Sequence, residues 1–151
     1  MRMSWQTLLA NGRVKRHKTS FQEISDLRDV VARDLRDAQV DTISADRRFA
    51  TAYNAVLQLT KMDLACSGYR VIGLGHHQTT FEALELALGR HAGNLAAYFD
   101  TCRRKRNQVD YDFAMVASDT EVEELLSSAE EFRTTVEVWI CAQHPAYAAQ
   151  R

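Results

Sequence analysis

The sequence contains little proline and little glycine: one proline and six glycines occur in 151 residues. Both residue types interrupt helices, so their scarcity favours long helices. No apolar run approaches the roughly 18 residues of a membrane-spanning helix, and the N-terminal residues lack the apolar core of a signal peptide. We therefore expect a cytoplasmic protein that makes no use of a membrane.

The sequence also lacks a strong charge of either sign and a regular cysteine pattern. A net charge of −1 argues against a globally basic nucleic-acid-binding protein. A local basic patch is still compatible with it, because charges act over about 10 Å. Cys66, Cys102 and Cys141 show no repeated spacing and lie at or near apolar positions, so we expect buried, reduced thiols. Zinc-binding spacings and phosphate-binding glycine loops are absent, and we expect neither a metal nor a cofactor.

Capping residues and apolar periodicity predict the helices. Ser20, Ser44 and Ser118 each precede a segment with apolar residues at helical spacing, and Gly68 is suited to end the second of these segments. The predicted helices are 21–40, 45–67, a short one at 81–88 capped by Thr79 or Thr80, 94–111 and 119–143. The helix at 45–67 is apolar on most faces, so we expect it to be central.

This pattern predicts an all-α protein: an up-and-down helical bundle of four long helices plus one short helix. We expect a single domain over residues 1–151, with an N-terminal extension at 1–18 and the bundle at 19–143. The basic residues at 13–18 are interpreted either as a surface linker, which is favoured, or as a phosphate-contacting arm.

The segment between Gly68 and Phe81 is predicted to be an ordered loop. Its Arg70-Val71-Ile72 alternation would suit a strand, but an isolated strand has nothing to pair with. The loop carries His76 and His77, whose side chains we interpret in three ways. They hydrogen-bond backbone groups, they act as acid or base in a cleft, or, least favoured because adjacent side chains on an extended chain point apart, they share a metal ion.

One stretch, residues 103–111, breaks the apolar pattern of its helix. Arg106 falls on the apolar stripe, where a guanidinium needs a carboxylate, a cleft or a bound anion as its partner. Asn107 and Tyr111 lie on the adjoining polar side and supply an amide, a hydroxyl and a ring on which a base can stack. The basic side chains that precede Arg106 are candidate nucleic-acid contacts: Arg103, Arg104 and Lys105. The alternative is a solvated face on which Arg103 and Arg106 pair with Asp100 or Asp110.

Several pieces of the chain occur together in the order found in a known family. They are the run Arg106-Asn107-Gln108-Val109-Asp110-Tyr111, Ser118-Asp119-Thr120-Glu121 with the long apolar helix after it, the segment 45–55, and Gly68-Tyr69-Arg70 with Gly75-His76-His77. Over roughly residues 40–143 they resemble the HEPN domain family. The resemblance implies a helical bundle that pairs into a homodimer, with Arg-x(4–6)-His motifs of two subunits forming one metal-independent ribonuclease site. It also implies a role as a toxin of a toxin–antitoxin pair, as a phage-defence effector, or beside a minimal nucleotidyltransferase.

The chain departs from that motif at its last position, where Tyr111 replaces histidine. A tyrosine whose pKa is near 10 is a poor base at pH 7, so His76 and His77 are the candidate substitutes. The site expected from the resemblance therefore comprises Arg106, Asn107, Tyr111, His76 and His77.

Three functions remain open at this stage. The first is a toxin or defence effector that binds or cleaves RNA. The second is a non-catalytic partner, or substrate-binding subunit, of a minimal nucleotidyltransferase. The third is a structural dimer in which Arg106 forms an interface ion pair.

Overall fold

The computed structural model describes residues 3–109 and 115–150, and 74% of the structure is helical. The mainly helical character predicted from the sequence is confirmed. The described helices are α1 (Trp5–Ala10), α2 (Phe21–Asp37), α3 (Ala45–Cys66), α4 (His76–Leu88), α5 (Gly93–Val109) and α6 (Asp119–Gln143), with short 3-10 helices η1 (Arg90–Ala92) and η2 (Pro145–Tyr147). Two short strands, β1 (Val14–Arg16) and β2 (Tyr69–Val71), complete the described elements.

The predicted caps begin three of the long helices. The side chains of Ser20, Ser44 and Ser118 each accept a hydrogen bond from the backbone N–H three residues on. Ser118 and Glu121 satisfy each other's backbone N–H groups in a complete capping box. Gly68 follows α3 with a φ of +96°, a left-handed conformation that glycine adopts without strain. These boundaries were accessible to sequence analysis because the interactions that set them are local.

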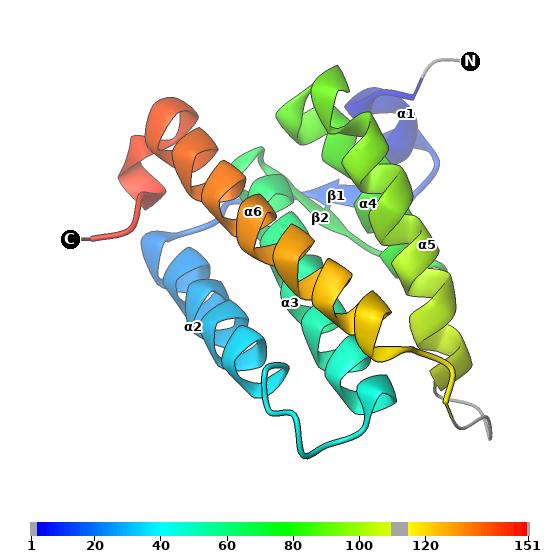
Figure 1. Cartoon of the computed structure of the whole chain (residues 1–151). Coiled ribbons are helices and arrows are strands. Elements are labelled where there is room, and N and C mark those ends of the chain that lie inside the picture. The colour runs from blue at the N-terminus through cyan, green and yellow to red at the C-terminus, as the bar shows by residue number, and fades with distance from the viewer. Residues whose placement is uncertain (1–2, 110–114, 151) are drawn as a thin grey trace.

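Helix α3 is the centre of the structure, as its all-round apolar sequence predicted. It contacts α2, α4, α5, α6 and β2 (Figure 1). Fourteen of its 22 residues are buried, so most faces of the helix meet protein. The elements that surround α3 are consequently positioned by their contacts with this one helix.

The segments 13–18 and 69–71 were predicted wrongly, as a linker and a loop. They form the antiparallel strands β1 and β2, with Val14 opposite Val71 and Lys15 opposite Arg70. Val14 is buried together with Leu8 of α1 and Leu64 of α3, so the N-terminal segment packs against the helices. Each strand supplies the pairing partner that the other needs to be stable. Because the two segments are far apart in the chain, neither segment alone indicates this pairing.

The start of α4 also differs from the prediction. The helix begins at His76 rather than at Phe81, with Gly75 as the N-cap at a φ of +69°. Thr79 and Thr80 do not cap it; they lie buried within it, and their hydroxyls donate to the carbonyls of Gly75 and His76. His76 and His77 therefore lie on the first turn of a helix and not in a loop.

The cysteines follow the expectation in part. Cys66 and Cys102 are buried and Cys141 is exposed, and all three are free thiols. The prediction of burial is wrong for Cys141 because that position of α6 faces solvent.

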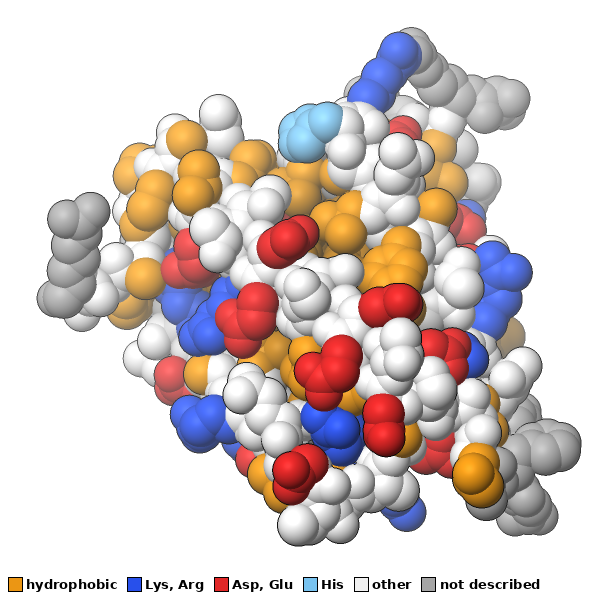
Figure 2. All heavy atoms as spheres, viewed as in Figure 1, with side chains coloured by type: hydrophobic (Ala, Val, Ile, Leu, Met, Phe, Trp, Pro, Cys, Tyr) orange, Lys and Arg blue, Asp and Glu red, His pale blue; other side chains and the backbone are white. Residues whose placement is uncertain are grey.

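The outer face of α6 is rich in acidic side chains. Figure 2 shows Asp and Glu side chains gathered over α6 on the face in view. The helix contains six glutamates: Glu121, Glu123, Glu124, Glu130, Glu131 and Glu137. Among the described helices, none is both long enough and apolar enough to cross a membrane.

Candidate functional site

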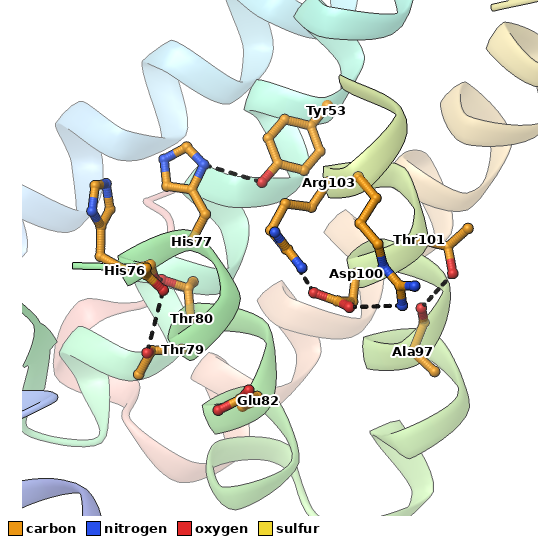
Figure 3. Close-up of polar contacts among 12 residues, drawn as sticks. Tyr53, His76, His77, Thr79, Thr80, Glu82, Ala97, Asp100, Thr101 and Arg103 are labelled. Atoms are coloured by element: carbon orange, nitrogen blue, oxygen red, sulfur yellow. Dashed lines mark hydrogen bonds and ion pairs between the residues drawn. The ribbon is translucent and has the colours of Figure 1, made fainter. Parts of the chain in front are cut away.

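The candidate site lies where α4 and α5 pack against α3. Figure 3 shows Tyr53 of α3 and His77 of α4 pointing toward each other, with Arg103 of α5 beside them. The Tyr53 hydroxyl is 3.3 Å from His77 Nδ1. Either the phenol donates to an unprotonated Nδ1, or a protonated Nδ1 donates to the phenol oxygen. The edge of Phe81 packs on Tyr53 at a ring-centroid distance of 5.8 Å, which holds the buried phenol in place.

The first turn of α4 fixes the two histidines against each other. Their rings meet edge-on at a centroid distance of 4.6 Å and an interplanar angle of 87°. Gly75 caps the helix without a side-chain hydrogen bond, so no capping side chain offsets the positive end of α4. A positive helix end disfavours an additional positive charge on the imidazole of His77.

Burial and neighbouring positive charge keep His77 neutral. Desolvation is the largest cause that lowers the His77 pKa to about 4, followed by His76, Lys61 and the two guanidiniums of Arg106 and Arg103. Burial raises the pKa of Tyr53 above its ordinary value, and Arg103 and Arg106 oppose that rise. At pH 7 the site therefore presents an uncharged imidazole and an uncharged phenol within the electrostatic reach of two guanidiniums.

The basic run of α5 is largely paired. Asp100 accepts hydrogen bonds from Arg103 Nε at 2.7 Å and from Arg104 Nη2 at 3.1 Å. Lys105 Nζ lies 2.5 Å from Glu121 of α6 and donates to the carbonyl of Val116. The alternative in which Arg103 pairs with Asp100 is thus observed. The Arg104 side chain is 67% exposed, so its guanidinium is accessible to a ligand despite its carboxylate partner.

The remaining residues expected from the motif lie on the second half of α5 or beyond it. Arg106 is half-buried and Asn107 is exposed. Arg106 is close enough to His77 and Tyr53 to influence the pKa of both. Tyr111, like Asp110, lies outside the described residues. The apolar stripe on which Arg106 was placed is buried at Phe99 and Cys102.

The structure places His77 within the electrostatic reach of Arg103 and Arg106, although these residues are separate in sequence. Residues 3–109 and 115–150 contain no cluster of three side chains suited to hold a metal ion. The residue that sequence reasoning missed is Tyr53, which the helical pattern assigned to the core. A buried tyrosine needs a partner for its hydroxyl, and that requirement was the available signal.

Comparisons of the chain with protein-family models, with curated proteins and with solved structures find no match. The resemblance to HEPN domains therefore depends on the sequence pieces given above.

Proposed function

We propose that this protein binds RNA at the junction of α4 and α5 and cleaves it there, as an effector of the toxin or phage-defence type. The observation that carries the proposal is the His77 imidazole, hydrogen-bonded to Tyr53 and within the electrostatic reach of the guanidiniums of Arg103 and Arg106, which with burial lower its pKa. A base that is unprotonated at pH 7 can remove a proton from a ribose hydroxyl, and guanidiniums can bind the phosphate that is attacked.

The proposed chemistry is transesterification within the RNA chain. His77 takes the proton of the 2′-hydroxyl, the 2′-oxygen attacks the adjacent phosphorus, and the bond from phosphorus to the 5′-oxygen breaks. The products are a 2′,3′-cyclic phosphate and a 5′-hydroxyl, the latter receiving its proton from the protonated imidazole or from water. This route requires the tautomer in which Nδ1–H donates to the Tyr53 oxygen, because only then does Nε2 keep a free lone pair. The other tautomer makes His77 a hydrogen-bond donor to phosphate.

The surface charges favour RNA on the α4–α5 side. The glutamates on the outer face of α6 repel a phosphate backbone, whereas Arg104 is exposed on α5. The HEPN resemblance further suggests a homodimer in which Arg106 and Asn107 of two copies line one cleft. The alternative function is that of a non-catalytic partner of a nucleotidyltransferase. It is favoured over RNA cleavage only if the dimer binds RNA without cutting it.

The test is cleavage of a mixed-sequence RNA pool by the wild type, His77→Ala and the matched control His91→Ala, an exposed histidine on η1. His77→Ala is expected to lower the cleavage rate by about 10²–10⁴-fold, the usual contribution of an acid–base group. Because the His77 pKa is about 4, the wild-type rate should vary little between pH 5 and pH 8 through this group. An equal loss in the His91→Ala control would contradict the role of His77.

RNA binding and assembly are measured on the same preparations. Arg106→Ala is expected to weaken RNA binding relative to Arg36→Ala, a control at an exposed arginine of α2. Light scattering is expected to show a dimer at micromolar concentration. Binding without cleavage in every variant would favour the non-catalytic partner, and the absence of binding would overturn the proposal.

A further inference from the structure

A pocket of about 580 Å³ opens between α2, α3, β2 and the start of α4. Its apolar wall includes Leu27 of α2 and Leu64 of α3. Two cationic side chains also line it, Lys61 of α3 and Arg70 of β2. A volume of a few hundred Å³ with mainly apolar walls and a few charged groups is typical of sites for small ligands.

The cations of this pocket form no ion pair with a carboxylate of the described residues, although Arg70 is near enough to Glu23 to act on it electrostatically. Among the described residues, neither Lys61 nor Arg70 has an acidic side chain within ion-pair distance. The one carboxylate in the pocket wall, that of Glu23, is hydrogen-bonded to His17 Nε2 and to the Thr19 hydroxyl, each at 2.7 Å. The pocket therefore has more positive charge than its own acidic group neutralises.

Two further observations place these positive charges close to one another. Desolvation, and then the charge of Arg70, lowers the pKa of Lys61. In the two-stranded sheet, Lys15 lies directly opposite Arg70, and like charges at such a position are destabilising. An anion beside Arg70 would relieve both repulsions.

We propose that this pocket binds a small organic anion, with its phosphate or carboxylate group between Lys61 and Arg70 and its apolar body against Leu27 and Leu64. Arginine suits this role because its planar fork binds either oxyanion through two hydrogen bonds. The pocket adjoins the proposed cleavage site, because His76 lines it, but the proposal does not depend on RNA cleavage. Lys61 also affects His77, so Arg70, which has no place in the proposed cleavage site, is the residue to change.

The test compares two probes with the same ring system, 1-naphthyl phosphate and 1-naphthol, by isothermal titration calorimetry on the whole chain. We expect the phosphate to bind at least tenfold more tightly than the alcohol. Arg70→Met should remove most of that difference and leave the affinity for 1-naphthol unchanged. The control Arg36→Met, at an exposed arginine on α2, should behave as the wild type.

Methyl NMR of the wild type locates the probes without any substitution. Leu27 and Leu64 should show the largest shift changes on addition of 1-naphthyl phosphate. Repeating the titration with octanoate distinguishes a phosphate site from a general carboxylate site, and binding of either anion at these methyls supports the proposal. Equal affinities for the two naphthyl probes, an equal loss in Arg36→Met, or no shift at these leucines would overturn it.

Discussion

Asp63 of α3 is the group whose substitution gives the clearest test of the structure. Its side chain is fully buried, and neither carboxyl oxygen has a hydrogen-bond partner among the described residues. Burial, and then the negative charge of Glu137, raises the pKa of Asp63 well above its ordinary value. Folding at neutral pH must therefore either attach a proton to this carboxyl or bury an unpartnered negative charge. Both destabilise the folded state, and Asp63→Asn removes both.

The size of the effect follows from the protonation equilibrium. An aspartate in the unfolded chain has a pKa of about 3.9, and each pH unit above it adds about 1.4 kcal/mol to the cost of keeping the proton. At pH 7 this cost is therefore at most about 4 kcal/mol. The direction of the pH dependence follows from the raised pKa, because the folded state binds the proton more tightly than the unfolded chain. The destabilisation by Asp63 is therefore absent below about pH 4 and grows as the pH rises.

The assay is thermal unfolding of the wild type and Asp63→Asn at pH 4 and at pH 7. Since 1 kcal/mol shifts the Tm of a chain of this size by about 2–4 °C, the variant is expected to melt up to about 16 °C higher at pH 7. At pH 4 the two proteins should melt at nearly the same temperature. Asp41→Asn, in the exposed connection between α2 and α3, is the matched control and should shift neither Tm. A variant that is less stable at pH 7, or equally shifted at both pH values, would refute the reasoning.

Two further predictions concern the site and a helix boundary. In an NMR titration the His77 ring is expected to titrate near pH 4, and Lys61→Met should raise that pKa because it removes one of the positive charges near the ring. A wild-type pKa near 6.5 would contradict the described burial of His77. Ser118→Ala should lower the free energy of unfolding by about 1 kcal/mol in a urea titration, because it removes the capping box of α6. The same change at exposed Ser127, in the middle of that helix, should cause no loss, and equal losses would contradict the capping argument.

Helix boundaries set by neighbouring residues could be predicted from the sequence. The caps at Ser20, Ser44 and Ser118 and the left-handed Gly68 involve residues within one or two turns of each other. The central position of α3 could also be predicted, because a helix that is apolar on most faces has to be covered on most faces. In each of these cases one short segment of the sequence contains the residues that determine the feature.

Features decided by distant contacts could not be predicted in this way. The strand at Tyr69–Val71 exists because Val14–Arg16 pairs with it, and the rule that an isolated strand is unstable was applied without that partner. The start of α4 was missed because Gly75 caps it without any side-chain hydrogen bond. Capping rules that depend on Ser or Thr consequently selected Thr79 and Thr80, which lie inside the helix.

In the candidate site, one physical rule identifies residues from the sequence but does not identify their contacts. A buried polar group needs a partner, and that rule singled out Arg106 from its place on a helical wheel. The same rule applies to the hydroxyl of Tyr53, which the apolar pattern of α3 hid among core residues. In neither case does the sequence identify the partner, because it does not give the packing of α3, α4 and α5 against one another. The packing of α3, α4 and α5 on one another therefore joins a histidine pair and a basic run, each ambiguous alone, into one cluster in which a neutral imidazole lies within the electrostatic reach of two guanidiniums.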